Sequence, residues 1–366
     1  MSILVRGLQK SFSSRRQGVK AVDDLSLEVE DGELLVILGP SGSGKTTLLR
    51  CIAGLERADA GTIVIDGRTV YSSEERIWVP PERRGVSMVF QSYALWPHMT
   101  VFANIAYPLR TRGTPKQQVR ERVMTALEMV GCGHLAQRHP NEISGGQQQR
   151  VAVARAIVGG ARVVLFDEPL SAVDARVRED LRHELVALQR DLGFASVYIT
   201  HDQTEAMAIG HRVAVLADGT IKQLARPREL YGRPVSTEVA SFMGATNQFS
   251  GPVVRRPAGT WTVRSELGPV TVSPDDAPSG DADATLIIRP EHWRITATRP
   301  ATDDNVWPAV IESSVFLGYC TEYRVRVADD RTVTVRSDDP APLEGDVWLH
   351  VPPSGVRVVQ GPAAIR

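Results

Sequence analysis

One segment constrains the fold of this chain more than any other part of the sequence. It consists of two glycines separated by four residues, then a lysine and two threonines: Gly39, Pro40, Ser41, Gly42, Ser43, Gly44, Lys45, Thr46 and Thr47. This pattern is typical of phosphate-binding loops. The apolar run 34–38 before it predicts a buried strand, and residues 48–53 after it predict a helix. A strand that turns through glycines into a helix aims several backbone N–H groups, and the positive end of the helix dipole, at one point.

The residue types in this loop suit a triphosphate. Glycine is needed where the backbone approaches a phosphate closely, because a Cβ would block that approach. Lys45 can reach the β- and γ-phosphates, and the hydroxyl of Thr46 can bind magnesium. The alternative is a glycine-rich turn that binds nothing. The flanking strand and helix favour the phosphate-binding interpretation.

Composition excludes several other classes of protein. The 366 residues leave room for two or three domains, and 42 basic residues balance 43 acidic ones, so there is no overall attraction to nucleic acid. The three cysteines, Cys51, Cys132 and Cys320, lie far apart, which argues against a disulfide framework or a zinc site. Residues 1–10 lack the apolar core of a secretory signal, and no apolar run approaches the ~20 residues that span a bilayer. We therefore expect a cytoplasmic protein that reaches a membrane only through a partner.

Four polar sites follow predicted strands, and together they predict one functional edge. Strand 34–38 leads to the loop beginning at Gly39, and strand 86–90 leads to Gln91. The strand that starts at residue 163 ends in the carboxylates Asp167 and Glu168, and strand 196–200 leads to His201. Strands that alternate with helices indicate a parallel sheet covered by helices, and such sheets bind ligands at the carboxyl ends of their strands. Pro169 favours a strand end between the two carboxylates, so that one can serve magnesium while the other faces the γ-phosphate.

Other segments complete the first part of the chain. Residues 1–33 predict β-structure, in which Phe12 either packs in a small core or stacks on an adenine ring. Residues 61–67 predict a strand that ends in an Asp-Gly turn of a hairpin. Apolar residues at helical spacing in 114–131 predict a helical insert over about 92–161. The tetrad Ser144, Gly145, Gly146 and Gln147 opens a helix at 151–158, either as a second anion site or as an ordinary cap.

The character of the sequence changes near residue 237. Phosphate-directed motifs stop, and valine alternation with Pro and Gly takes over. Residues 321–336 predict a hairpin, and the polar residues 274–283 predict a loop. We expect residues 237–366 to form a small all-β barrel with no catalytic cluster.

The order of these motifs resembles the ATPase subunits of ABC transporters, and most closely those of binding-protein-dependent importers with a C-terminal β domain of the TOBE type. The matching parts are the Walker A loop 39–46, the Q-loop residue Gln91, the signature 144–147, the Walker B strand 163–168, the D-loop 171–174 and the switch residue His201. The segment Arg289-Pro290-Glu291 is similar to the accessory β domain of such importers. Ile143 and Val173 replace the usual leucines, and Phe12 stands where Tyr or Trp is commoner.

The resemblance implies a fold and a chemistry. The fold is an α/β P-loop NTPase domain at residues 1–236, with its helical subdomain at about 92–161, followed by an OB-like barrel at 237–366. The cofactors are ATP and Mg²⁺, and two subunits pair head to tail. Lys45 and the loop amides hold the phosphates; Thr46, Gln91 and Asp167 serve magnesium; Glu168 polarises water, and His201 contacts the γ-phosphate. The signature closes on the nucleotide of the partner subunit, and Asp174 acts across the interface.

The resemblance also implies partners. An integral membrane permease would dock a short helix beside Gln91, where residues 92–98 offer aromatic and apolar groups; the alternative is that Tyr93 and Trp96 only pack the helical insert. A solute-binding protein would act indirectly, no nucleic acid is involved, and the subunit would lie at the cytoplasmic face of the inner membrane. Residues 79–109 are similar to iron(III) importers first and to polyamine importers second.

A different class must be weighed against the transporter. Some proteins with these motifs act in translation or DNA repair, but they carry two cassettes or a coiled-coil insert, and this sequence has one cassette and no sustained heptads. An ATP-binding regulator is the other alternative, and Glu168 argues for hydrolysis over binding alone.

Overall fold

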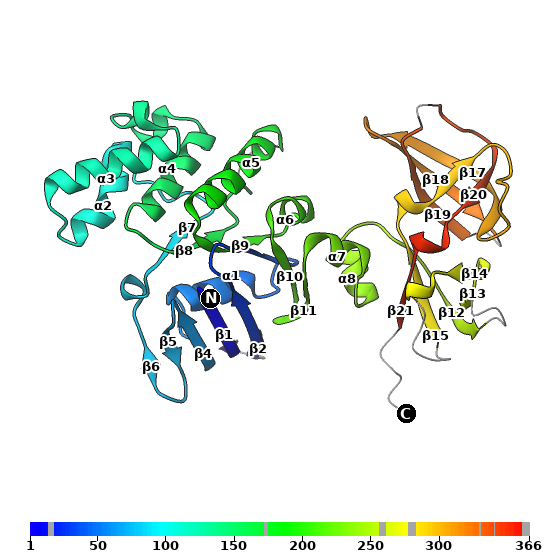
Figure 1. The fold of residues 1–366 in the computed structure, drawn as a ribbon, viewed down its shortest axis with the longest axis horizontal. Coiled ribbons are helices and arrows are strands. Elements are labelled where there is room, and N and C mark those ends of the chain that lie inside the picture. The colour runs from blue at the N-terminus through cyan, green and yellow to red at the C-terminus, as the bar shows by residue number, and fades with distance from the viewer. Residues whose placement is uncertain are drawn as a thin grey trace. The chain divides into compact units, whose positions relative to one another are not determined.

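The chain forms two compact units in the computed structural model, Met1–Arg228 and Glu229–Arg366 (Figure 1). The structure describes residues 1–13, 18–171, 175–255, 261–276, 283–328, 331–339 and 341–360. The predicted boundary after residue 236 stays a prediction that a truncated fragment would test. Among the described residues, no helix has the length and apolar character needed to cross a membrane.

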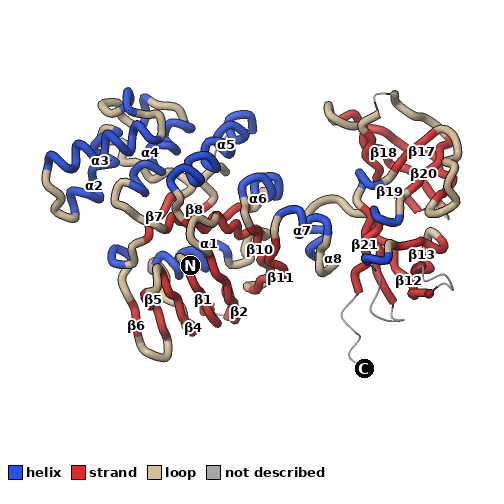
Figure 2. The backbone as a smooth tube through the Cα atoms, viewed as in Figure 1, coloured by secondary structure: helices blue, strands red, loops and turns tan. Residues whose placement is uncertain are grey.

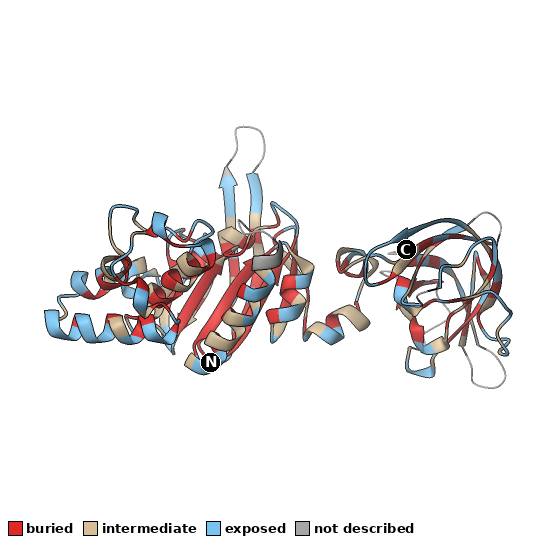
Figure 3. Cartoon of the chain, turned by 90° about the horizontal axis from the view of Figure 1, so that it is seen from above, coloured by how far each residue is buried: buried red, intermediate tan, exposed pale blue. Residues whose placement is uncertain are grey.

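A six-stranded sheet organises the first unit. Its order is β11-β10-β3-β9-β8-β7, and all neighbours are parallel except β10 and β11. Strands β3 and β9 are buried along their whole length, as expected for a parallel sheet covered on both faces (Figure 3). The strands are β3 (Leu34–Leu38), β7 (Val86–Val89), β8 (Val163–Asp167), β9 (Ala195–Thr200), β10 (Arg212–Ala217) and β11 (Thr220–Ala225).

A second, antiparallel sheet shares a core with the first. Its order is β2-β1-β4-β5-β6, and its apolar side chains join those of β3, β8, β9 and helix α1 in one cluster. The predicted Asp-Gly hairpin is confirmed, with Asp66 and Gly67 both at positive φ between β4 and β5. The elements are β1 (Ile3–Ser13), β2 (Gly18–Val29), α1 (Lys45–Ala53), β4 (Ala60–Ile65), β5 (Arg68–Ser72) and β6 (Ile77–Trp78).

The predicted helical insert contains three helices that build their own apolar core. Figure 2 shows α2 (Val101–Thr111), α3 (Lys116–Met129) and α4 (Gly145–Ile157) grouped together, apart from the antiparallel sheet. The predicted start of α4 at residue 151 is wrong, because the helix already begins at Gly145. Its N-cap Ser144 and Gln147 form a capping box, which outweighs the low helix propensity of the two glycines. Helices α5 (Ala175–Leu192) and α6 (Gln203–Ile209) complete the unit.

The second unit is all-β apart from short helices, as the sequence predicts. Two antiparallel five-stranded sheets, β14-β13-β12-β15-β21 and β16-β20-β17-β18-β19, enclose one apolar core. The predicted hairpin is formed by β18 and β19, while residues 277–282 of the predicted loop lie outside the described residues. The elements are α7 (Pro227–Gly232), α8 (Thr237–Phe242), β12 (Asn247–Arg255), β13 (Trp261–Ser265), β14 (Gly268–Val272), β15 (Asp283–Ile288), β16 (Arg294–Thr296), β17 (Val306–Phe316), β18 (Thr321–Val327), β19 (Arg331–Ser337), β20 (Asp346–His350) and β21 (Val356–Gln360).

Candidate nucleotide site

The polar groups predicted from the sequence lie at one edge of the central sheet. The loop beginning at Gly39 follows β3, Asp167 is the last residue of β8, and His201 follows the last residue of β9. Gln91 comes two residues after β7 and is exposed. Because β3, β9, β8 and β7 are parallel neighbours, their carboxyl ends all point to this edge.

Two glycines of the loop are required by the neighbouring backbone. A Cβ on Gly39 would overlap the carbonyl oxygen of Leu216 at the end of β10. A Cβ on Gly44 would overlap the carbonyl oxygen of Ala21, and Gly44 has a φ of 100°, which L-residues rarely adopt. The packing of β2 and β10 against the loop therefore selects glycine before any phosphate is bound.

Lys45 lies folded over its own loop. Its Nζ donates hydrogen bonds to the carbonyl oxygens of Gly39 and Pro40, at 2.8 and 2.9 Å, and the side chain is only 5% exposed. Burial lowers the pKa of the Lys45 ammonium, and the nearby carboxylates Glu168 and Asp167 oppose that shift. The ammonium therefore lies near the two carboxylates at this end of the sheet and donates its hydrogen bonds to backbone carbonyl oxygens. Of the remaining loop residues, Ser43 is buried, Thr47 is half-buried, and Ser41 and Gly42 are exposed.

Thr46 and Asp167 bring two oxygen ligands together. The Thr46 hydroxyl donates to Asp167 Oδ1 at 3.4 Å, although 121 residues separate them in the chain. Burial raises the pKa of the Asp167 carboxyl, while Arg50 and the hydrogen bond from Thr46 act against that rise. A hydroxyl and a carboxylate are hard oxygen donors of the kind that magnesium takes beside a bound phosphate, so these residues fit the ion.

Glu168 pairs with the switch histidine. Its Oε2 lies 3.0 Å from Nδ1 of His201, and the side chains are 23% and 56% exposed. Glu168 has a φ of 46°, and both the amide and the hydroxyl of Ser171 donate to its carbonyl oxygen. The strand therefore ends between Asp167 and Glu168, as predicted, but the left-handed backbone at Glu168 itself turns the chain there before Pro169 is reached.

Glu205 is a buried carboxylate that sequence reasoning missed. It is 3% exposed, and it accepts hydrogen bonds from the hydroxyls of Tyr198 and Thr200 at the end of β9. Its backbone N–H donates to Asp202, the N-cap of α6, at 2.9 Å. Burial raises the pKa of Glu205. This cluster fixes the turn that carries His201, and the Asp-x-x-Glu spacing of a capping box was the signal that could have found it.

The signature tetrad forms a helix cap away from the phosphate loop. Ser144 Oγ accepts from the Gln147 amide at 3.3 Å, and Gln147 Oε1 accepts from the Ser144 amide at 3.0 Å. A Cβ on Gly146 would lie 3.1 Å from Leu181 of α5. Within the part of the chain that the structure describes, no hydrogen bond or ion pair joins this tetrad to residues 39–47. Ala172, Val173 and Asp174 of the predicted D-loop lie outside the described residues.

Two aromatic predictions have different outcomes. Phe12 on β1 is 43% exposed, with Lys10 Nζ 5.1 Å from its ring, so a flat surface is available there; its adenine role stays a prediction. The expectation that residues 92–98 expose their aromatic groups is wrong for Tyr93, which is only 6% exposed because the turn folds it inward. Trp96 is half-buried and packs against the exposed Tyr107 of α2, with ring centroids 4.6 Å apart and the ring planes tilted by 47°.

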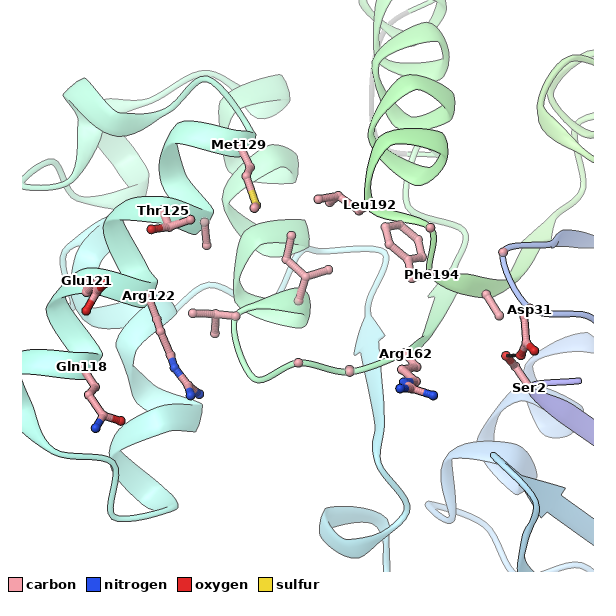
Figure 4. Close-up of a pocket in the computed structure, with 18 residues that line it drawn as sticks. Ser2, Asp31, Gln118, Glu121, Arg122, Thr125, Met129, Arg162, Leu192 and Phe194 are labelled. Atoms are coloured by element: carbon pink, nitrogen blue, oxygen red, sulfur yellow. Dashed lines mark hydrogen bonds between the residues drawn. The ribbon is translucent and has the colours of Figure 1, made fainter.

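A large cleft lies at the opposite edge of the central sheet. It has a volume of about 1210 Å³ and lies between helix α3, the end of α4 and the starts of the strands (Figure 4). Asp31 precedes β3, Arg162 precedes β8 and Phe194 precedes β9, which places this cleft at the amino ends of the parallel strands. The predicted nucleotide residues are not part of it.

Profiles of two protein families match the chain. The profile described as ABC transporter matches residues 22–171, which include the phosphate loop, the signature and both carboxylates at the end of β8. The profile described as TOBE domain matches residues 286–359 in the second unit.

Three named relatives are ATP-binding proteins. The spermidine/putrescine import ATP-binding protein PotA of Acidothermus cellulolyticus is 41% identical over 354 residues, which cover 95% of this chain and 91% of the relative. The trehalose/maltose import ATP-binding protein MalK of Thermococcus litoralis is 52% identical and covers 62% of this chain and 61% of the relative. The sn-glycerol-3-phosphate import ATP-binding protein UgpC of Chromohalobacter salexigens is 46% identical and covers 78% of this chain and 74% of the relative.

Two solved structures are similar to the first part of the chain. The dimeric structure of MJ0796, a bacterial ABC transporter cassette, matches with a TM-score of 0.53 and 30% identity, over 62% of this chain and 99% of that chain. A dimeric post-hydrolysis state of the same cassette, bound to ADP and Pi, matches with a TM-score of 0.52 and 29% identity, again over 62% and 99%.

Proposed function

The chain belongs to the ABC transporter family, among the ATP-binding import subunits that carry a C-terminal TOBE domain, and from this premise we propose that it drives solute import by ATP-driven closure of a head-to-tail homodimer. The protein binds and hydrolyses ATP. The observation that carries the proposal is the contact between Glu168 and His201 beside Lys45, Thr46 and Asp167 at one sheet edge.

The phosphates would be held by Lys45 and the loop amides. The Lys45 ammonium exchanges its carbonyl partners in the loop for phosphate oxygens, which restores full charge pairing to a buried cation. Thr46 and Asp167, with Gln91 from the turn after β7, would hold magnesium. When bound, this ion neutralises phosphate charge. Phosphoryl transfer depends on such positioning and charge neutralisation more than on covalent chemistry.

Glu168 would orient and polarise the attacking water. Its carboxylate can accept the water proton, and His201 can donate from Nδ1 to Glu168 Oε2 across 3.0 Å, which holds the carboxylate in one rotamer. To donate to the γ-phosphate at the same time, the other ring nitrogen of His201 would also have to carry a proton, so that the imidazole acts as a donor at both nitrogens. Glu205 would position this histidine by locking the turn between β9 and α6.

Head-to-tail pairing would complete each site. The signature residues form no hydrogen bond or ion pair with the phosphate loop of their own subunit among the described residues, so they remain available to a partner's nucleotide. The solved cassette that resembles this unit is described as a dimer. A two-fold axis gives two equal composite sites, and Asp174 would act across the same interface. Loss of phosphate removes the charge that both halves bind, so the dimer reopens.

The membrane partner would be an integral permease fed by a solute-binding protein, with this subunit at the cytoplasmic face of the inner membrane. Trp96 and Tyr107 form the aromatic surface on which a permease helix would dock. For the solute we favour a polyamine. The relative named for spermidine and putrescine matches 95% of this chain, a larger share than the sugar or glycerol-phosphate relatives. Iron(III), which residues 79–109 favour, is the alternative that uptake of labelled spermidine against labelled ferric iron would separate.

The dimer is tested with a hydrolysis-blocked variant. Glu168→Gln with ATP and magnesium should shift the isolated protein toward dimer in light scattering, because closure occurs without cleavage. Adding Ser144→Arg should abolish the shift, since a bulky cation would occupy the partner's γ-phosphate position. Adding Thr125→Arg, the same gain of charge on the exposed face of α3, should leave the shift unchanged. A shift that survives Ser144→Arg would contradict the composite site.

The permease surface is tested separately. Trp96→Asp should abolish transport and co-purification of the permease, because it removes the ring from the aromatic surface and places a carboxylate there, which would be desolvated when the helix docks with only Arg155 near enough to pair with it. ATP-driven dimerisation should survive, since Trp96 forms no phosphate contact. Trp78→Asp on β6 is the matched control, at a tryptophan that is 45% exposed elsewhere in the unit. If Trp96→Asp still co-purifies with permease at the wild-type level, or if no permease is found, a soluble ATPase or an ATP-binding regulator becomes the better description.

A further inference from the structure

The turn that follows Gln91 has an unusual backbone. Tyr93 and Ala94 have φ values of 58° and 48°, so two consecutive residues with side chains adopt the left-handed conformation. Such residues avoid this region because Cβ crowds the following carbonyl oxygen. A turn of this kind persists only when surrounding groups hold it in place.

Arg155 of α4 holds both strained residues. Its guanidinium donates to the carbonyl oxygen of Ala94 at 2.6 Å and to that of Tyr93 at 2.7 Å, and it lies over the Trp96 ring at 5.1 Å. Burial lowers the pKa of Arg155. No ion pair to this residue occurs among the described residues, so its charge is balanced by the two carbonyl groups and the ring alone. The partly buried guanidinium is therefore held by the residues of this turn.

Asn104 holds the far side of the same loop. This fully buried side chain accepts from the Trp96 amide at 2.8 Å. It donates to the carbonyl oxygens of Trp96, Met99 and Thr100 at 3.1 to 3.2 Å. The loop is therefore fixed to α2 by Asn104 and to α4 by Arg155, and its residues Gln91 and Ser92, which follow the carboxyl end of β7, are exposed.

Helix α4 connects this turn to the signature tetrad. The helix starts at Gly145 beside its N-cap Ser144, and Arg155 lies ten residues further on, about 15 Å along the axis at 1.5 Å per residue. The two glycines of α4 lie in its first turn and the helix contains no Pro, so the remainder behaves as a rod, and a displacement at the signature end reaches the guanidinium. The two carbonyl bonds then pass it to the residues after Gln91.

We propose that Arg155 is a positioning residue that couples the signature tetrad to the Q-loop turn, so that engagement of the signature by a partner subunit sets the place of Gln91 and of the Trp96 surface. This inference rests on the proposed head-to-tail function and adds a route for it. Arg155 acts through the backbone of Tyr93 and Ala94 and contacts no phosphate-directed side chain.

Arg155→Met tests the coupling because it keeps most of the aliphatic stem and removes both donors. In the full-length protein, kcat for ATP should fall about tenfold or more, while KM stays within about threefold, since Lys45 and its loop are untouched. Amide hydrogen exchange over residues 91–99 should become faster. Arg155→Lys keeps the charge but replaces the planar two-nitrogen fork with a single nitrogen, so its effect should lie between those of wild type and Arg155→Met. The matched control is Arg112→Met, which removes a single guanidinium bond to the Gly159 carbonyl oxygen and should change neither quantity.

A rescue variant separates positioning from general stability. Glycine adopts the left-handed conformation without penalty, so Ala94→Gly in the Arg155→Met background should restore kcat by about fivefold. A double variant no faster than Arg155→Met, or an Arg155→Met enzyme as active as the Arg112→Met control, would overturn the proposal. Wild-type protein assayed in parallel keeps the two claims distinguishable: absent wild-type turnover contradicts the proposed function, whereas normal wild-type turnover with unaffected Arg155 variants contradicts only the coupling.

Discussion

The two units differ in what their buried polar groups bind. In Glu229–Arg366, Asn247 pairs with both backbone groups of Thr334, and Asn305 pairs with both backbone groups of Thr271, each bond being 2.8 Å. Arg289 is 3% exposed and donates to the carbonyl oxygens of Tyr231, Ala240, Gly244 and Ala245. These side chains replace backbone hydrogen bonds that strand pairing leaves unmade, so they stabilise the β unit.

The candidate nucleotide site of Met1–Arg228 contains charged groups whose burial lowers the stability of the fold. Burial raises the pKa of Asp167 and lowers that of Lys45, which means that both charged forms lose hydration there. Glu168 adds a left-handed backbone. A bound nucleotide and its ion would compensate these buried charges. Without them the charges lower the free energy of unfolding, which is the usual conflict between stability and activity. The comparison teaches that burial alone does not separate a functional polar group from a structural one. Lys45 and Arg289 both donate to backbone carbonyl oxygens, and what distinguishes Lys45 is the pair of carboxylates, Asp167 and Glu168, beside it.

The largest expected effect is a loss of ATP hydrolysis in a protein that remains folded. Glu168→Gln should lower ATP hydrolysis by about a hundredfold or more, because the amide is nearly isosteric but a far weaker base. Nucleotide titration should give nearly unchanged affinity. Lys45→Ala is the contrasting variant and should weaken nucleotide binding itself. Normal steady-state hydrolysis by Glu168→Gln would remove this residue from its assigned role.

In the β unit Glu229–Arg366, we expect a substitution to lower stability and to leave ATP binding unchanged. Arg289→Met should lower the free energy of unfolding by about 2–4 kcal/mol, because several buried carbonyl oxygens lose their donor. ATP affinity per folded molecule should stay unchanged. Denaturant unfolding followed by tryptophan fluorescence measures the effect. The control Arg299→Met removes an exposed ion pair with Asp303 and a contact with the Trp348 ring, and should cost less than about 1 kcal/mol. An equal loss in both variants would refute the structural role of Arg289.

A truncated chain tests whether the first unit binds ATP without the β unit. A fragment of residues 1–241 should bind ATP with an affinity within about threefold of the full chain, because every phosphate-directed group precedes that point. Its ATP-driven dimerisation should be weaker if the β units pair in the full-length dimer. Calorimetric titration of the folded fragment decides the matter, and a folded fragment that binds no nucleotide would show the proposed boundary to be misplaced.

The smallest expected effect concerns the loss of stability caused by burying the Asp167 carboxylate in the candidate nucleotide site. Since the raised pKa means that folded Asp167 holds its proton to higher pH than unfolded Asp, the contribution of this residue to the free energy of unfolding falls as pH rises above about 4. Asp167→Asn removes this titration, so Tm at neutral pH should rise by about 1–3 °C, and the difference should vanish toward pH 4. Asp218→Asn, at a carboxylate 89% exposed, should show no such rise. A lower Tm for Asp167→Asn at neutral pH would mean that the carboxylate stabilises the fold.

Much of the architecture follows from local sequence. The strand, loop and helix around Gly39 and Lys45, the Asp-Gly hairpin and the alternation of strands with helices depend on residue type and spacing over a few positions. Local signals failed where a cap competed with propensity, as at Gly145, and where burial reversed an expected exposure, as at Tyr93.

The sequence by itself determined which chemical groups the protein carries and that they follow parallel strands, because strand pattern and loop composition are local properties. Only the tertiary structure decided which groups touch. Thr46 meets Asp167 across 121 residues, Glu168 meets His201 across 33, and Arg155 meets the turn at Ala94 across 61. The neighbours that exclude a Cβ at Gly39 and Gly44 also come from distant segments. Strand order and register bring such residues together, and neither can be read from the spacing of residues along the chain.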